Sequence, residues 1–166
     1  MINGHLGWHY LYARQYDQAI EQFRRTLELD PTFPQSQRYA AWAFLQKGRH
    51  EEAIAALRAA LKGLGGQSEV EAELGYALAI AGQRAEARAM LEGLRQLSSS
   101  RYVSPYSVAL VHAGLGDRGQ ALAWLDKAYD ERSDYIAYLR LEPMLDPLRS
   151  DPRFDALVRR VGLPSP

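Results

Sequence analysis

Apolar residues recur along most of the chain at the spacing of an amphipathic α-helix, as in Ala53, Leu57, Ala60 and Leu61. This pattern returns every 34 residues, with no insertion or deletion across four copies. Small residues in two of its columns would allow helix backbones to approach closely. The chain is therefore expected to be all-α. The columns that define the period are Gly7, Ala41, Gly75 and Ala109; Arg14, Gly48, Gly82 and Gly116; Ala19, Ala53, Ala87 and Ala121; and Phe23, Leu57, Leu91 and Leu125.

Glycine ends the first helix in three of the four copies, where it can take the left-handed conformation that closes a helix. The second helix is expected two to four residues later, with Asp117 and Gln120 as a capping box in the last copy. Ser68 and Ser104 are expected to N-cap the first helices of their copies. Each copy is thus helix, tight turn, helix, and the copies span about residues 1–33, 34–67, 68–101 and 102–133.

Residues 134–166 break the period, because Pro143, Pro147 and Pro152 divide them into short helices. A last helix is expected after Asp151, with Phe154, Leu157 and Val158 on one face. We expect this segment to form a C-terminal cap on the fourth copy, and we expect Trp124 to pack against it.

The 34-residue period, with Leu6-Gly7, Tyr10, Tyr16, Ala19, Phe23 and Pro31, resembles the tetratricopeptide repeat. The later copies depart where Gly65, Ser99 and Ser133 replace Pro31, and the third also carries Arg88 and Leu94. The resemblance implies a right-handed α-solenoid of four repeats that acts as a non-catalytic protein-interaction module. It also leads us to expect either a module of a longer protein or a small protein with an uncapped first repeat.

The C-terminal part is similar to the ends of bacterial proteins that join such repeats to a protein kinase or a winged-helix domain. The stretches that carry this similarity are YVSPYSVALVHAGLGD and LRSDPRF. It implies, as one alternative, a regulatory or assembly arm of a larger signalling or transcription protein. Self-association is a second alternative.

Charge and composition narrow the function classes. Lys+Arg and Asp+Glu number 20 each, which argues against nucleic acid as the main partner. The absence of cysteine excludes disulfides and thiol chemistry and fits a cytoplasmic location. Neither a signal peptide nor a membrane-spanning apolar run is apparent.

Potential chemical groups do not assemble into a catalytic site. His5 and His9 have the spacing of two metal ligands but lack a third, so no metal is expected. His112 occupies an apolar column and is interpreted as a partly buried histidine with one hydrogen bond. The glycines at 63–66 terminate a helix, and the serines at 98–100 lack a nucleophile motif. We therefore expect neither enzyme activity nor a cofactor.

A stripe of aromatic residues lies away from the predicted core face of the first helices. Trp8, Trp42, Tyr76 and Leu110 are 34 residues apart. In the family that the chain resembles, this face lines the concave side, so the stripe predicts a groove for a peptide or helix. The alternative is that these aromatics pack between repeats. The groove lacks the residues of the family's carboxylate clamp, so a chaperone-tail ligand is not expected. The predicted groove residues are Trp8, Tyr12, Arg38, Tyr39, Trp42, Gln46, Glu73, Tyr76, Tyr106 and Leu110.

Overall fold

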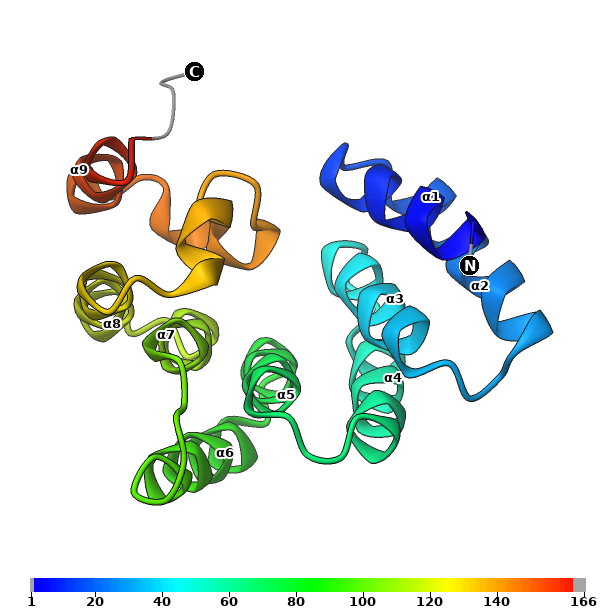
Figure 1. Cartoon of the computed structure of the whole chain (residues 1–166), viewed down its shortest axis with the longest axis horizontal. Helices are drawn as coiled ribbons and strands as arrows, with labels where there is room; N and C mark the ends of the chain where they lie inside the picture. Colours follow the sequence, from blue (N-terminus) through cyan, green and yellow to red (C-terminus); the bar gives the residue numbers. More distant parts are fainter. Residues whose placement is uncertain (1, 163–166) are drawn as a thin grey trace.

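The computed structural model describes residues 2–162, with side chains from His5 onward, and every regular element in that part is a helix. Figure 1 shows the helices as a curved stack of pairs, with α1 and α9 toward its two ends. The second helices of the pairs begin at residues 16, 50, 84 and 118, which keeps the 34-residue period. The elements are α1 (Ile2–Tyr12), α2 (Tyr16–Leu29), α3 (Pro34–Gln46), α4 (His50–Gly63), α5 (Ser68–Ile80), α6 (Arg84–Leu97), α7 (Pro105–Gly114), α8 (Arg118–Asp130), the 3-10 helices η1 (Asp134–Tyr138) and η2 (Pro143–Leu148), and α9 (Pro152–Arg160).

The tight turns form as the glycine column predicts. Gly48 has φ +71°, and its N–H donates to the carbonyl of Leu45 at 3.0 Å. The next N–H, of Arg49, donates to Phe44 at 2.9 Å, which completes the two bonds of a Schellman motif. In the first repeat Arg14 takes the same left-handed conformation, with φ +59°.

Of the three N-caps predicted within the repeats, two are confirmed at least in part. Ser104 Oγ accepts a hydrogen bond from the N–H of Tyr106, and Asp117 Oδ1 accepts one from the N–H of Gln120. The return half of the capping box does not form, because the N–H of Asp117 donates to the His112 carbonyl instead. The prediction for Ser68 is wrong: α5 begins at that residue, and its hydroxyl faces Glu69 rather than a free N–H.

The small-residue columns make the close helix contacts that the pattern predicts. Ala19, Ala53, Ala87 and Ala121 are all 0% exposed. A Cβ added to Gly7 would lie 2.6 Å from Cε1 of Phe23, so α1 and α2 can pack at this distance only with glycine there. The alanine and glycine columns therefore set the spacing within each helix pair.

The helix α9 covers the fourth repeat as expected. Phe154, Leu157 and Val158 are buried, and Arg160 bonds Asp126 of α8 at 2.7 Å. The prediction for Trp124 is wrong, because it lines a hollow beside the α6–α7 connection, next to Tyr102 and Val108, and not the C-terminal segment.

Residues 134–149, here called the inner segment, correct the expectation of a simple end cap. Figure 1 shows this segment on the inner side of the curve, between α7 and the α1–α3 end of the stack. Its apolar residues Leu139, Leu145 and Leu148 are 0% exposed. Asp146 reaches the first repeat, where it bonds Arg14 at 2.7 Å across 132 residues of sequence.

Candidate functional site

The predicted groove residues lie on α1, α3, α5 and α7, but most of them are covered. Trp42 and Tyr76 are each 5% exposed, so neither is open to a partner in the way that the predicted groove requires. Tyr76 packs on α7, where a Cβ at Gly114 would lie 2.9 Å from its ring, and thus follows the alternative of packing between repeats. The buried members are Arg38, Trp42, Glu73, Tyr76, Tyr106 and Leu110, and the partly buried ones are Trp8, Tyr12, Tyr39 and Gln46.

Tyrosines of the inner segment face the aromatic residues of the groove. Tyr135 stacks on Tyr106 with ring centroids 5.6 Å apart. Tyr138 lies 6.2 Å from Tyr12, which in turn contacts Trp8 edge-on at 4.6 Å. Aromatic pairs at these separations add to the stabilisation from burial alone. The chain therefore supplies its own aromatic residues to the surface where a partner's side chains were predicted.

Arg38 and Glu73 form a buried ion pair that links α3 to α5. Arg38 Nε lies 2.9 Å from Glu73 Oε2, and the two side chains are only 8% and 2% exposed. The guanidinium also lies over the ring of Trp42, 5.6 Å from its centroid. Burial raises the pKa of Glu73, while the guanidinium opposes that rise. Removing either partner would leave an uncompensated buried charge.

Glu142 of the inner segment places a second carboxyl group, besides that of Glu73, at the same cavity. It is 3% exposed, and its Oε1 accepts a hydrogen bond from the N–H of Met144 at 3.1 Å, which caps η2. Burial raises its pKa to about 8, and the neighbouring Glu73 adds to the rise. This raised pKa favours the protonated, neutral form of Glu142 at pH 7.

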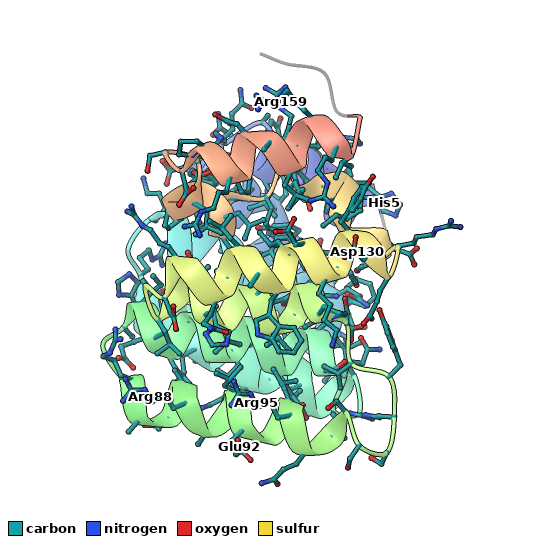
Figure 2. The ribbon with its side chains drawn as sticks, turned by 90° about the vertical axis from the view of Figure 1, so that its left-hand side faces the viewer. His5, Arg88, Glu92, Arg95, Asp130 and Arg159 are labelled. Carbon is teal, nitrogen blue, oxygen red and sulfur yellow. The ribbon has the colours of Figure 1, made fainter. Side chains whose placement is uncertain are left out.

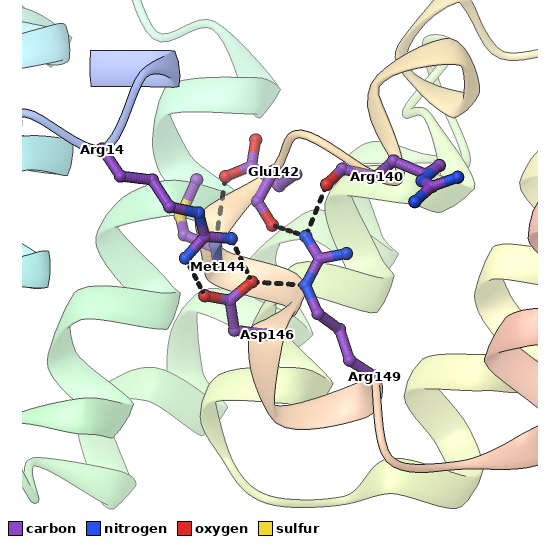
Figure 3. Close-up of polar contacts among 6 residues, drawn as sticks. All are labelled: Arg14, Arg140, Glu142, Met144, Asp146 and Arg149. Carbon is purple, nitrogen blue, oxygen red and sulfur yellow. Dashed lines mark hydrogen bonds and ion pairs between the residues drawn. The ribbon is translucent and has the colours of Figure 1, made fainter. Parts of the chain in front are cut away.

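Asp146 joins the inner segment to the first repeat through two guanidinium groups (Figure 3). Arg14 binds it with two hydrogen bonds, of 2.7 and 2.9 Å, and Arg149 donates from Nε. Arg149 also donates to the carbonyl of Arg140 at 2.7 Å, which fixes the turn between η1 and η2. Burial alone would raise the pKa of Asp146, but the two guanidinium groups hold it below its usual range.

The space left between the inner segment and the groove is small. A cavity of about 10 Å³ remains there, close to the minimum that can hold one water. Trp42 Nε1 and the hydroxyl of Tyr106 are buried without a hydrogen-bond partner among the described residues. Among the described residues, the part of the predicted groove around this cavity has no room for a peptide. The cavity is lined by Arg38, Trp42, Glu69, Glu73, Tyr106, Ser107, Leu110, Tyr135 and Glu142.

The other potential chemical groups lie apart from this site. His5 and His9 are exposed, and no group of three or more His, Asp or Glu is placed to bind a metal in residues 2–162. The hydroxyls of residues 98–100 donate to carbonyls of the last turn of α6, so they close that helix. Gly65 and Gly66 have positive φ and follow α4, as a helix terminator requires.

The sequence did not predict that residues 134–149 would lie against the predicted groove residues. Four of the residues that make these contacts lie after the 34-residue period ends, so no repeat column indicates their partners. They are Tyr135, Tyr138, Glu142 and Asp146. The one available signal was Arg14, which stands where the later repeats have glycine.

Comparisons with known proteins agree with this architecture. Residues 6–69 match the family model described as a tetratricopeptide repeat. The resemblance is thereby confirmed for that part of the chain, and this repeat generally mediates protein–protein interaction without catalysis. No curated protein matches the chain.

Among solved structures, the fold is similar to that of PilW, described as a widely conserved type IV pilus biogenesis factor. The TM-score is 0.61 at 20% identity, and the match covers 99% of this chain and 78% of PilW. At that identity the likeness supports an all-α helical repeat fold. None of the helices described here has the length and apolar character needed to cross a membrane.

Proposed function

We propose that the chain is a non-catalytic protein-interaction module whose concave aromatic surface binds a peptide or helix of a partner. The observation that carries the proposal is that this surface already accommodates a short-helical segment, residues 134–149 of the chain itself. Tyrosine stacking and guanidinium–carboxylate contacts hold that segment, and both kinds of contact are common in protein recognition. The surface comprises the predicted groove residues from Trp8 to Leu110.

The two halves of the inner segment differ in how firmly they are held. In η2, Met144, Leu145 and Leu148 are at most 1% exposed, so removing it would re-expose a large apolar area. In η1 no residue is buried, and Tyr138 remains 38% exposed. A partner would therefore displace η1 and leave η2 in place. Its own aromatic or apolar side chains would then stack where Tyr135 and Tyr138 now lie.

The proposal can be tested in the full chain by weakening this cover. The double variant Tyr135→Ala/Tyr138→Ala removes both rings from the groove without touching its walls. A synthetic, fluorescently labelled peptide with the sequence of residues 132–141 serves as the probe, and fluorescence anisotropy measures its binding. We expect the variant to bind it at least tenfold more tightly than wild type, because the tethered segment no longer competes at its high effective concentration.

Tyr102→Ala provides the matched control, since this tyrosine is 67% exposed and lies on the α6–α7 connection. It should leave peptide binding at the wild-type level. Equal, weak binding by all three proteins would refute displacement of η1. Light scattering on the same samples reports whether η1 instead enters the groove of a second copy, which would give a dimer.

A further inference from the structure

A second hollow lies on the outer side of the stack, between α6 and the turn that joins α7 to α8. Its volume is about 380 Å³, within the range of ligand-binding pockets. Figure 2 shows Arg88, Glu92 and Arg95 along α6, with Arg95 in the space between α6 and α8. We call this hollow the outer pocket. It is lined by Arg84, Arg88, Leu91, Glu92, Arg95, His112, Leu115 and Asp117.

The outer pocket lies at the junction of the third and fourth repeats, where both depart from the pattern of the other copies. Arg88 and Arg95 of the third repeat and His112 of the fourth stand at positions that are apolar or aromatic in the other copies. In the fourth repeat, Leu122 is buried and Tyr129 bonds Arg160 of the next helix layer, so this face normally packs on a neighbour. Between the third and fourth repeats, polar side chains stand at the positions that make this apolar packing elsewhere. The columns are Ile20, Ile54, Arg88 and Leu122; Leu27, Leu61, Arg95 and Tyr129; and Tyr10, Phe44, Leu78 and His112.

His112 forms the inner wall of the outer pocket, and its nearest polar neighbour is the carboxylate of Asp117. It is 5% exposed, and neither ring nitrogen makes a hydrogen bond within the described part of the chain. Its Nδ1 lies 3.6 Å from Asp117 Oδ2, which is longer than a hydrogen bond. The sequence-based expectation of one hydrogen bond is therefore wrong. A buried donor without a hydrogen-bond partner is uncommon in native proteins and calls for an explanation such as an ordered water, an ion or another ligand.

The arginines supply charge that is free to bind an anion. Arg84 donates to the carbonyl of Leu115 at 2.8 Å, which holds it against the turn. Within residues 2–162, neither Arg88 nor Arg95 forms an ion pair or a side-chain hydrogen bond, although Glu92 lies between them on the helix. Guanidinium groups match the geometry of phosphate oxygens through paired N–H donors. A neutral imidazole adds one further donor.

We propose that the outer pocket binds a phosphate group, carried either by a small molecule or by a phosphorylated side chain of a partner. Arg88 and Arg95 would bind its oxygens from α6, and His112 would donate from the pocket wall. The carboxylates of Glu92 and Asp117 disfavour a larger polyanion, so a single phosphate group suits the pocket better. This site is separate from the concave groove and does not depend on it.

Histidine NMR on the full-length chain tests the proposal. Inorganic phosphate is titrated against sodium chloride at matched ionic strength, and His5 and His9, which are exposed, serve as internal references. We expect saturable shifts of the His112 ring signals and a roughly tenfold increase in its proton affinity, because an adjacent anion favours the imidazolium. Shifts shared by all the histidines, or reproduced by chloride, would overturn the proposal.

Two variants locate the binding. Arg88→Ile and Arg95→Leu restore the apolar residues that other repeats carry at these positions, so both should fold, which circular dichroism verifies. Each should weaken phosphate binding roughly tenfold or more. Arg159→Ala, on α9, is the matched control and should have no effect. Unchanged binding in both pocket variants would show that phosphate binds elsewhere and would refute the site.

A phosphoserine peptide and its unphosphorylated form then distinguish the two sources. Tighter binding of the phosphopeptide than of inorganic phosphate supports a phosphorylated partner. Binding of inorganic phosphate but not of the phosphopeptide supports a small-molecule ligand. Failure of both probes to shift His112 contradicts the proposal and leaves the concave groove untouched, because the η1 experiment measures that surface independently.

Discussion

Glu142 shows how a single residue of the inner segment makes stability depend on pH. The pKa of the Glu142 carboxyl group is about 8 in the folded chain. In the unfolded chain it returns to the ordinary glutamate value of about 4.3. Between these values the folded state binds more protons than the unfolded state. Stability therefore falls as the pH rises through this window, by up to roughly 1 kcal/mol per pH unit from this group.

The variant Glu142→Gln should remove this part of the pH dependence. The amide keeps an oxygen that can accept from the N–H of Met144, but it has no proton to lose. Urea unfolding between about pH 5 and 8 gives the difference in stability between variant and wild type, in which the contributions of other groups such as His112 cancel. We expect the variant to gain relative to wild type as the pH rises. A difference that is constant with pH would mean that Glu142 titrates normally.

At the level of elements, the two halves of the inner segment differ: η2 is the buried anchor, and η1 is the more exposed cover of the predicted groove. Leu145 of η2 is 0% exposed, while Leu141, in the turn before it, is 50% exposed. Leu145→Ala should lower the free energy of unfolding by about 2–5 kcal/mol, because it leaves a cavity in a packed core. Leu141→Ala is the matched control and should change it by less than about 0.5 kcal/mol. Equal, small losses in urea unfolding would show that η2 is not an anchor.

The elements themselves were largely predictable, because one period specifies them. Ala53 and its column fix the helix contacts, and Gly48 and its column fix the turns. Helix ends were less predictable where several polar residues compete, as at Ser68 and Gln67. The packing of Trp124 was missed because a helix pattern gives the face of a residue but not which neighbour covers that face.

For the whole molecule, the residues that depart from the 34-residue period indicate the proposed sites better than the residues that follow it. Arg88, Arg95 and His112 interrupt three apolar columns at one junction, and Arg14 interrupts the glycine column of the turns. The sequence shows that these residues are exceptional, yet not what they contact. Asp146 lies 132 residues from Arg14 in a segment without repeats. Burial of Tyr76 between repeats was one of the two alternatives for the aromatic stripe, but the contact of Tyr106 with Tyr135 could not be predicted, since it depends on where residues 134–149 fold.

The ion pair between Arg14 of the first repeat and Asp146 of the inner segment leads to a prediction for the whole chain. Arg14 and Arg132 both hold positive φ, +59° and +55°, where a side chain costs about 1 kcal/mol relative to glycine. Arg132→Gly should therefore raise the free energy of unfolding by about 1 kcal/mol.

Arg14→Gly removes the same backbone strain but loses an ion pair with Asp146. This pair is half-exposed and contributes on the order of 0–1 kcal/mol. The net gain of Arg14→Gly should be smaller at low salt and approach that of Arg132→Gly at high salt, because salt screens the lost pair. Urea unfolding of both variants at two salt concentrations measures this. Equal gains at low salt would show that the ion pair does not stabilise the closed arrangement.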